Sequence, residues 1–349
     1  MADCYATSGG SASLVVTVRD EATTIDALCA SIAAQTCPPD EVVVVDGGST
    51  DDTLARLAAW QDRLPLRVLI CPGANISAGR NAGIRAARHD TVAVTDAGVR
   101  LAPGWLAALL APLRADNAVE VVAGFFLPDP RTPFETAMGA TVLPALADVR
   151  PPTFLPSSRS VAFRRGAWAA AGGYPEWLDY CEDVVFDLRL RAASRRFAFA
   201  PAAVAHFRPR GTWRAFWIQY YRYARGDGKA GLFARRHAIR YGTYAGLAWF
   251  VARGRRHPRL WPLALGAGAA YVRRPYTRLL PALPALGPRD RAAALLAVPV
   301  IRLAGDFAKM AGYPVGLLWR ARRYGLRRDW RTIGQDSGRS AGGRGERGG

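Results

Sequence analysis

The chain has 349 residues, half of them hydrophobic, and its formal net charge is +19. This apolar content is enough for a full core, so it indicates a globular protein with one large domain and an extension, or with two domains. The charge is uneven, because acidic residues populate the N-terminal half and arginines crowd the sequence from Arg189 onward. We expect the second half to have an anionic partner, which can be a membrane surface, a phosphorylated substrate or a nucleic acid.

Short apolar strands alternate with amphipathic helices from residue 14 to about residue 113. The expected strands are 14–18, 42–45, 66–70 and 91–95, and the expected helices are 23–34, 53–60 and 77–87. This rhythm is typical of βαβ units on a largely parallel sheet. The pattern then loosens, with expected strands at 119–124 and 160–163 and expected helices at 165–171 and 181–193. The sequence therefore predicts an α/β fold.

The most informative segment is a buried strand that ends in an acidic, glycine-rich turn. Four consecutive valines lead to Asp46, Gly47 and Gly48 follow, and Asp51 and Asp52 open the next helix. Open α/β sheets bind ligands at the carboxyl ends of their strands, and the helix dipole accounts for the two later aspartates. Asp46 is therefore the carboxylate that we expect to be free for a ligand. Taken alone, the segment is equally compatible with a plain polar connection.

Two further segments fit a diphosphate at the same edge of the sheet. Residues 75–83 open a helix after the third strand, so their backbone amides and Arg80 are well placed for phosphate oxygens. The strand at 91–95 ends in Asp96, close to Asp46 if the two strands are neighbours. Two strand-end carboxylates suggest a divalent cation, Mg²⁺ or Mn²⁺, that bridges the diphosphate.

Two segments further along the chain suggest a reaction at a hydroxyl group. Glu182 and Asp183 open a helix, and a carboxylate on that first turn can act as a base toward a hydroxyl; helix capping is the alternative. A later helix carries several aromatic residues, with Gln219 and Arg222 on one face. Aromatic faces bind sugar rings, although such a stripe also suits a core.

The C-terminal apolar runs raise the question of a membrane. Residues 241–252, 260–272 and 292–301 carry no charge, but each is shorter than the ~18–20 residues that a spanning helix requires. Flanking arginines and aromatics suit helices that lie in the headgroup region or form a shallow hairpin, and core helices are the alternative. The first ten residues lack the features of a secretory signal. We expect the cytoplasmic face of the cell membrane, with peripheral or shallow attachment.

Taken in order, these segments resemble the family-2 glycosyltransferases, which are nucleotide-sugar enzymes of the GT-A fold. The resemblance covers about residues 13–230 and rests on ordered motifs at residues 16–25, 45–53, 75–83, 96–98, 182–183 and 219–223. It implies a Rossmann-like, mainly parallel sheet flanked by helices, followed here by a helical, membrane-associated extension. Residue 77 is serine where the family usually has glycine.

The resemblance implies a role for each matching residue. On the donor side, Asp46 binds the nucleobase, Glu21 lies beside the nucleotide and Arg80 contacts the diphosphate. Asp183 is the base of an inverting direct displacement, with Glu182 as its partner on the acceptor or diphosphate side. The same side includes a variant of the Gln-x-x-Arg-Trp motif of processive synthases, formed by Gln219, Arg222 and Tyr223, with tyrosine in place of tryptophan.

The metal motif departs from the family pattern. The family usually shows Asp-x-Asp, whereas this chain has Asp96 followed by Ala97 and Gly98, so one carboxylate is missing. His206 is a candidate for a compensating ligand, and a structural role for this histidine is the alternative. A divalent cation therefore remains an expectation that depends on Asp96.

The expected domains are a flexible N-terminus (1–12), a nucleotide-sugar half (13–113), an acceptor half (114–232), an apolar and basic extension (233–330) and a disordered tail (331–349). The expected partners are a nucleotide-sugar donor, a hydroxyl acceptor, either lipid-linked or soluble, and an anionic membrane surface. Two other functions remain open: a non-catalytic sugar-nucleotide scaffold and, with less support, a nucleic-acid-binding protein. We expect no nucleic acid, because the arginines interleave with apolar runs and do not form a solvated stripe.

Overall fold

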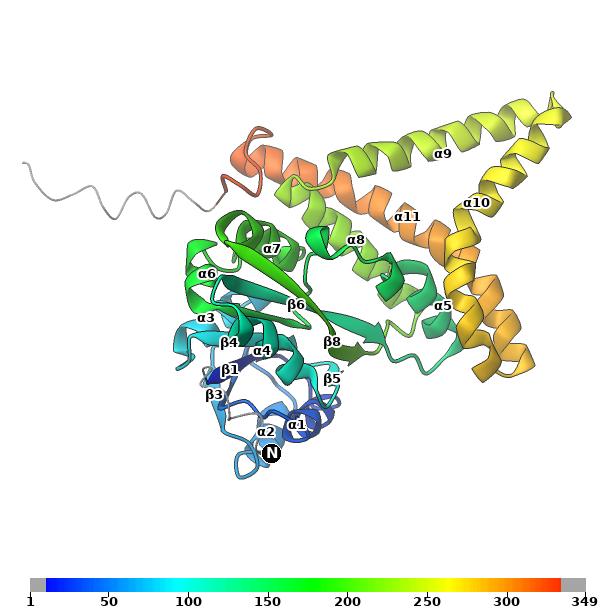
Figure 1. The fold of residues 1–349 in the computed structure, drawn as a ribbon. Coiled ribbons are helices and arrows are strands. Elements are labelled where there is room, and N and C mark those ends of the chain that lie inside the picture. Colours follow the sequence, from blue (N-terminus) through cyan, green and yellow to red (C-terminus); the bar gives the residue numbers. More distant parts are fainter. Residues whose placement is uncertain (1–10, 334–349) are drawn as a thin grey trace, which may run out of the picture. The chain divides into compact units, whose positions relative to one another are not determined.

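The computed structural model describes residues 11–333, and Figure 1 shows its fold. Within these residues the chain forms two compact units, the first from residues 11–129 and 146–207 and the second from residues 130–145 and 208–333. The expected disordered tail, apart from residues 331–333, and all but two residues of the expected flexible N-terminus lie outside the described residues.

An eight-stranded sheet forms the centre of the first unit, in the order β3-β2-β1-β4-β7-β6-β8-β5. The strands are β1 (Ala12–Val18), β2 (Glu41–Asp46), β3 (Leu66–Ile70), β4 (Thr91–Asp96), β5 (Val99–Leu101), β6 (Val119–Pro128), β7 (Val161–Arg164) and β8 (Arg196–Phe207). β1 is parallel to β2 and β4, and β2 is parallel to β3. β7 is antiparallel to β4 and β6, and β5 is antiparallel to β8. The sheet is therefore parallel in its N-terminal half, as expected, and mixed beyond it.

Helices cover both faces of this sheet. They are α1 (Ile25–Ala33), α2 (Thr53–Ala58), α3 (Ile76–Ala86), α4 (Trp105–Ala115), α6 (Arg165–Ala170) and α7 (Glu182–Ala193), with 3₁₀ turns η2 (Leu146–Asp148) and η3 (Pro151–Thr153). One core joins Leu14 and Val16 to α1 and α4, and the other joins Val15 and Val43 to α3, α6 and α7. Because successive strand residues point to opposite faces, both faces of the valine-rich strands are buried.

Two glycines let α3 lie very close to the sheet. A Cβ at Gly83 would lie 2.6 Å from Val15 Cγ1, and a Cβ at Gly79 would lie 3.0 Å from Thr17 Cγ2. A larger residue at either position would push the helix away from β1. The small residues of the segment at 75–83 therefore fix the height of Arg80 above the sheet.

The second unit is helical. Its elements are α5 (Pro133–Val142), α8 (Trp213–Ala230), α9 (Ala234–Gly254), η4 (Pro258–Leu260), α10 (Trp261–Leu279), η5 (Leu280–Ala285) and α11 (Pro288–Tyr324). A Cβ at Gly316 would lie 2.0 Å from the Arg225 carbonyl oxygen, and one at Gly228 would lie 2.4 Å from the Tyr313 carbonyl oxygen. The backbones of α8 and α11 therefore touch through their glycines.

The boundary between the units differs from the expected one. We expected the helical extension to begin at residue 233, but the second unit begins at Arg208 and also includes residues 130–145. The physical reason is that α8 packs its glycines against α11, and α5 shares an apolar core with both helices. Among the described helices, none combines the length and the apolarity needed to cross a membrane.

Candidate active site

The carboxyl ends of β2 and β4 lie at one edge of the sheet. In the parallel register Val18 of β1 pairs with Asp46, and Thr17 pairs with Asp96. β1 lies between the two aspartates, so β2 and β4 are not direct neighbours, and two strand spacings separate them by about 10 Å. The loop that follows β1 thus passes between the two carboxylates.

Asp46 is buried, and its carboxylate is held by its own turn. One oxygen accepts hydrogen bonds from the Gly48 and Ser49 amides, both at 3.0 Å, and the other accepts one from the Ser49 hydroxyl at 2.5 Å. The carboxylate is therefore not free of protein contacts, because the glycine turn folds back on it, and its role toward a ligand stays a prediction. Gly48 permits this turn with its positive φ of 95°.

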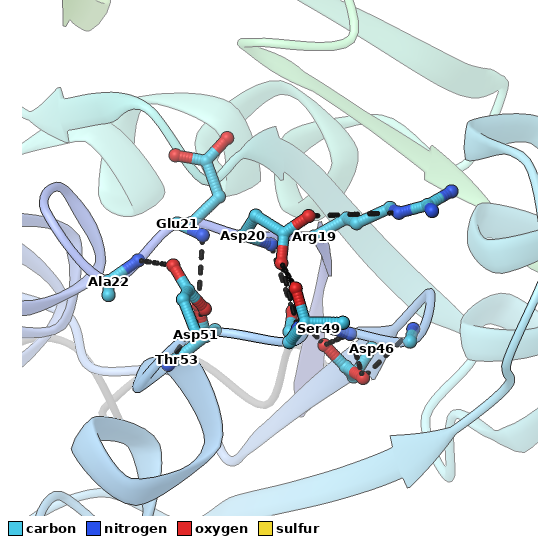
Figure 2. A network of polar contacts seen from close by, with 10 residues as sticks. Arg19, Asp20, Glu21, Ala22, Asp46, Ser49, Asp51 and Thr53 are labelled. Atoms are coloured by element: carbon cyan, nitrogen blue, oxygen red, sulfur yellow. Dashed lines mark hydrogen bonds and ion pairs between the residues drawn. The ribbon is translucent and has the colours of Figure 1, made fainter.

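The loops after β1 and β2 are joined by polar contacts, which Figure 2 shows. The Asp20 amide donates to the Ser49 hydroxyl at 2.9 Å, and the Glu21 amide donates to the Thr53 hydroxyl at 2.8 Å. The Glu21 carboxylate accepts from Thr24 and extends away from the contacts between the two loops (Figure 2). The two loops therefore form one rigid corner beside the end of β1.

The polar residues of the segment at 75–83 hold a second loop. Asn75 caps α3 through the Ala78 amide, at 2.9 Å, and donates to the Glu176 carbonyl at 2.7 Å. The Asn81 amide nitrogen donates to the Tyr174 carbonyl at 2.9 Å, and its oxygen accepts from the Tyr174 amide at 2.9 Å. The loop that leads into α7 is thereby fixed to α3.

Arg80 is the centre of the site. Its guanidinium donates to Asp96 at 2.6 Å and to Glu182 at 3.0 Å, and it lies over the Tyr174 ring at 5.1 Å from the centroid. The side chain is only 3% exposed. Burial opposes its charge, but the nearby carboxylates, Asp96 above all, raise the pKa of Arg80 above its ordinary value. Arg80 therefore links the end of β4 to the start of α7.

The carboxylates at the start of α7 outnumber the cations near them. Burial and the neighbouring Asp183 raise the pKa of Glu182 to about 7, although Arg80 opposes this shift. Burial and Asp183 also raise the pKa of Asp187 well above its ordinary value, and the Oδ2 atom of Asp187 has no hydrogen-bond partner within the described residues. Asp183 is more accessible, and its Oδ1 accepts from the Val184 amide at 2.8 Å. Asp183 is thus the member of this group that a bound hydroxyl can reach most easily.

Asp96 contacts two arginines. Arg159 lies 3.6 Å from it and Arg80 lies 2.6 Å from it, and together they lower the pKa of Asp96 below its ordinary value, against the effect of burial. In residues 11–333, no group of three or more His, Cys, Asp or Glu side chains is arranged to hold a metal ion. One carboxylate between two arginines is not in itself a divalent-cation site, so the residues present do not fit the expected metal.

His206 and the α8 residues belong to other elements of the fold. His206 is on β8 opposite Arg100 of β5, and burial, reinforced by Arg100, lowers its pKa. Gln219, Arg222 and Tyr223 are on α8 of the second unit, where the Gln219 amide donates to the Tyr223 hydroxyl at 2.8 Å. Their roles at the sugar or diphosphate remain predictions, as does that of His206 at a metal.

Known proteins resemble both the sequence and the fold. The sequence model of the family described as Glycosyl transferase family 2 matches residues 13–149. Two validoxylamine A glucosyltransferases, from Streptomyces hygroscopicus subsp. limoneus and subsp. jinggangensis, are 32% identical to the chain over 126 residues, or 35% of this chain. The match covers 28% and 30% of those proteins, so the chain spans less than a third of the curated relatives that it matches.

A solved structure extends the likeness to the whole fold. The mannosyltransferase PcManGT from Pyrobaculum calidifontis, in complex with GDP-Man and Mn²⁺, has a TM-score of 0.51 and 20% identity, over 91% of this chain and 88% of that one. The class defined by the fold is a mixed α/β protein of the GT-A type. Residues 13–149 match the family-2 glycosyltransferases, which confirms the recognition made from the motifs.

Sequence patterns did not identify several residues of the site. Arg159 and Tyr174 carry no motif, and only their contacts with Asp96 and Arg80 reveal them. Asp187 had a usable signal, because it lies one helical turn after Asp183 in an otherwise apolar stretch. Asn81 lay inside a motif that we had assigned to the diphosphate, whereas it holds the loop before α7.

Proposed function

We propose that this protein is a glycosyltransferase that moves a sugar from a nucleotide-diphosphate sugar to a hydroxyl acceptor. The observation that carries this proposal is the bridge from Asp96 through Arg80 to Glu182, which brings a donor-side strand end next to Asp183. Ligands of open α/β sheets bind at this edge. The match of residues 13–149 to the family supports the same activity.

The donor is proposed to lie in the corner formed by the loops after β1 and β2. Asp46 ends β2 in this corner and is proposed to meet the edge of a nucleobase, and Glu21 is in the neighbouring loop, where its carboxylate extends away from the contacts between the loops. Arg80 receives a role different from the expected one. Because it is buried and its terminal nitrogens bind carboxylates, we propose that it positions Asp96 and Glu182 and does not bind the diphosphate.

The proposed reaction is a direct displacement with inversion. Asp183 takes the proton of the acceptor hydroxyl as that oxygen forms a bond to the anomeric carbon. The bond between the anomeric carbon and the diphosphate oxygen breaks at the same time, and its electron pair leaves with the nucleoside diphosphate. Arg80 holds Glu182 beside Asp183, which keeps the base at a fixed position on the first turn of α7.

The test is transfer or hydrolysis across UDP-, GDP- and dTDP-sugars, with Mg²⁺, Mn²⁺ or EDTA. Asp183→Asn should lower turnover by at least about 100-fold and leave donor affinity nearly unchanged, because only the base is removed. Asp187→Asn is the matched control on the same helix, because Asp187 is buried and its Oδ2 atom has no hydrogen-bond partner within the described residues, so an amide of the same size replaces it. Normal turnover by Asp183→Asn would eliminate it as the base.

A non-catalytic sugar-nucleotide scaffold is the second candidate. The observation in its favour is that the described residues assemble no metal-binding group. Binding of one nucleotide sugar without turnover, across soluble and lipid-linked acceptors, would support it. Release of a nucleoside diphosphate in an acceptor-dependent reaction would exclude it and would identify the donor.

An acceptor that is lipid-linked, or part of a cell-envelope glycan, is our preferred proposal because the C-terminal helices are apolar and basic.

A further inference from the structure

The pair of helices α9 and α10 carries charge of one sign only. Residues 234–279 contain ten arginines and no aspartate or glutamate. Figure 1 shows the two helices meeting at η4, and the sequence around that tip, Arg253-Gly-Arg-Arg-His-Pro-Arg259, is the most basic part of the pair. From residue 247 to residue 265 the polar side chains are four arginines and one histidine, with no neutral polar residue. Such a surface differs from that of an ordinary solvated helix pair.

The same part of the helix pair exposes large apolar side chains. On α9 these are Leu247, Trp249 and Val251, and on α10 they are Trp261, Leu263 and Leu265. Trp249 is 59% exposed and Leu265 is 72% exposed. Isolated exposed apolar residues are normal, but a group of six beside a basic tip marks an interaction surface.

The base of the helix pair is fixed to α11 by buried polar contacts. Arg240 donates to Asp306 at 2.8 Å, and Tyr271 donates to the same carboxylate at 2.5 Å. Tyr244 and Tyr271 join α9 to α10 through their hydroxyls at 3.2 Å. The apolar residues therefore lie on the distal part of an anchored hairpin.

We propose that the distal part of the α9–α10 hairpin docks into the interface of an anionic lipid bilayer. The arginines at the tip contact lipid phosphates, and the leucine, valine and tryptophan side chains enter the boundary between headgroups and acyl chains, about 5–10 Å deep. This inference extends the proposed function by naming the surface on which the enzyme works. A second copy of the hairpin is a poor occupant, because it would place arginines against arginines.

The test is binding of the full chain to vesicles, without donor or acceptor. We expect binding to vesicles of phosphatidylcholine with phosphatidylglycerol to be at least about tenfold tighter than to phosphatidylcholine alone, and to weaken with salt. The triple variant Arg253→Gln, Arg255→Gln, Arg256→Gln should lose about tenfold or more of this affinity. Its control is Arg63→Gln, Arg85→Gln, Arg131→Gln, which changes the same net charge at exposed arginines outside the hairpin.

A second pair of variants tests the contribution of the exposed apolar side chains to vesicle binding. Leu247→Glu should weaken vesicle binding several-fold, whereas Leu146→Glu, at a leucine of nearly equal exposure (46% and 47%), should not. A blue shift of Trp249 and Trp261 emission on anionic vesicles, lost in a Trp249→Phe, Trp261→Phe variant, supports insertion. Circular dichroism of each variant must match the parent chain, so that a loss of binding is not unfolding.

Three outcomes would overturn the inference: equal binding to neutral and anionic vesicles, equal losses in the hairpin and control variants, or a lipid-independent dimer abolished by Leu247→Glu. Vesicle binding by a protein that binds no nucleotide sugar would leave the hairpin inference intact and remove the proposed function. Sugar transfer by a protein that does not bind vesicles would support the proposed function and overturn the hairpin inference.

Discussion

Each unit of the protein contains an ionic cluster, around Arg80 in the first and around Asp306 in the second, and the two clusters differ in composition. In the first unit Arg80 contacts Asp96 and Glu182 and lies within electrostatic reach of Asp183, and Arg159 is a second arginine beside Asp96. In the second unit Asp306 accepts from Arg240 and Tyr271 and lies within electrostatic reach of Lys309, and Arg240 also contacts His237, which pairs with Asp227. In the first cluster the carboxylates outnumber the cations, and in the second the cations outnumber the carboxylates.

The pKa values follow from this contrast. In the first cluster the surplus of carboxylates, together with burial, raises the pKa of Glu182 to about 7. In the second, burial and the surrounding arginines lower the pKa of Lys309 to about 8, although Asp306 opposes the shift. The described residues offer Lys309 no ion-pair partner, and its ammonium group lies over the Tyr220 ring at 4.8 Å. Negative charge is thus in excess at the proposed active site, and positive charge is in excess beside the α9–α10 hairpin.

The largest effect is expected for Arg80→Met. This change leaves Asp96 and Glu182 buried without their shared counter-charge, which should lower the free energy of unfolding by about 3–5 kcal/mol. Denaturant unfolding measures it, with Arg63→Met, at an exposed arginine, as the control. An unchanged midpoint for Arg80→Met would mean that Arg80 does not hold the cluster together.

Asp306→Asn should have the next largest effect. It removes the carboxylate that accepts from Arg240 and Tyr271 and lies within electrostatic reach of Lys309, and a loss of about 2–3 kcal/mol is expected from the charged hydrogen bonds. The exposed Asp290→Asn, on the same helix, should change the free energy of unfolding by less than about 1 kcal/mol. Equal effects of the two changes would contradict a structural role for the second cluster.

Glu182→Gln tests the carboxylate surplus through pH. The folded protein binds the Glu182 proton more tightly than the unfolded chain, so this residue costs stability as pH rises from its ordinary pKa of 4.5 to about 7. The melting temperature of Glu182→Gln relative to the parent chain should therefore increase over that range. A constant difference between pH 4.5 and pH 7 would show that the Glu182 pKa is not raised.

Lys309→Met tests the cation surplus and should give the smallest effect, with the opposite trend. The folded protein releases the Lys309 proton more easily than the unfolded chain, so the parent chain gains stability as pH rises from about 8 to its ordinary pKa of 10.5. The advantage of Lys309→Met over the parent chain should be greatest below pH 8 and should shrink toward pH 10.5. An advantage that grows over that range would contradict the cation surplus.

The sequence predicts the first half of the fold well and the second half poorly, for physical reasons. The valine run and the glycine turn identify β2 and Asp46 because local periodicity and turn chemistry determine them. β8 was missed because its half-exposed, alanine-rich sequence has no clear alternation, and its place depends on pairing with β6 and β5. The boundary at Arg208 was missed because contacts between distant glycines determine it.

The candidate site shows the same limit. The motif at 75–83 singles out Arg80, which lies at the centre of the candidate site. Its partners are 16 and 102 positions further along the chain, so no local pattern distinguishes a diphosphate from a pair of carboxylates as its partner. The missing second metal carboxylate is visible at Gly98, and the structure assembles no group that replaces it within the described residues.

The glycine contacts between α8 and α11 have a mechanical consequence. Side chains can change rotamer to absorb a displacement, but backbones in direct contact at Gly228, Gly312 and Gly316 have no such slack. The two helices must therefore shift as one stiff lever. Because α11 also anchors the hairpin through Asp306, a force on the tip of the hairpin is transmitted along this lever to Gln219 and Tyr223 on α8.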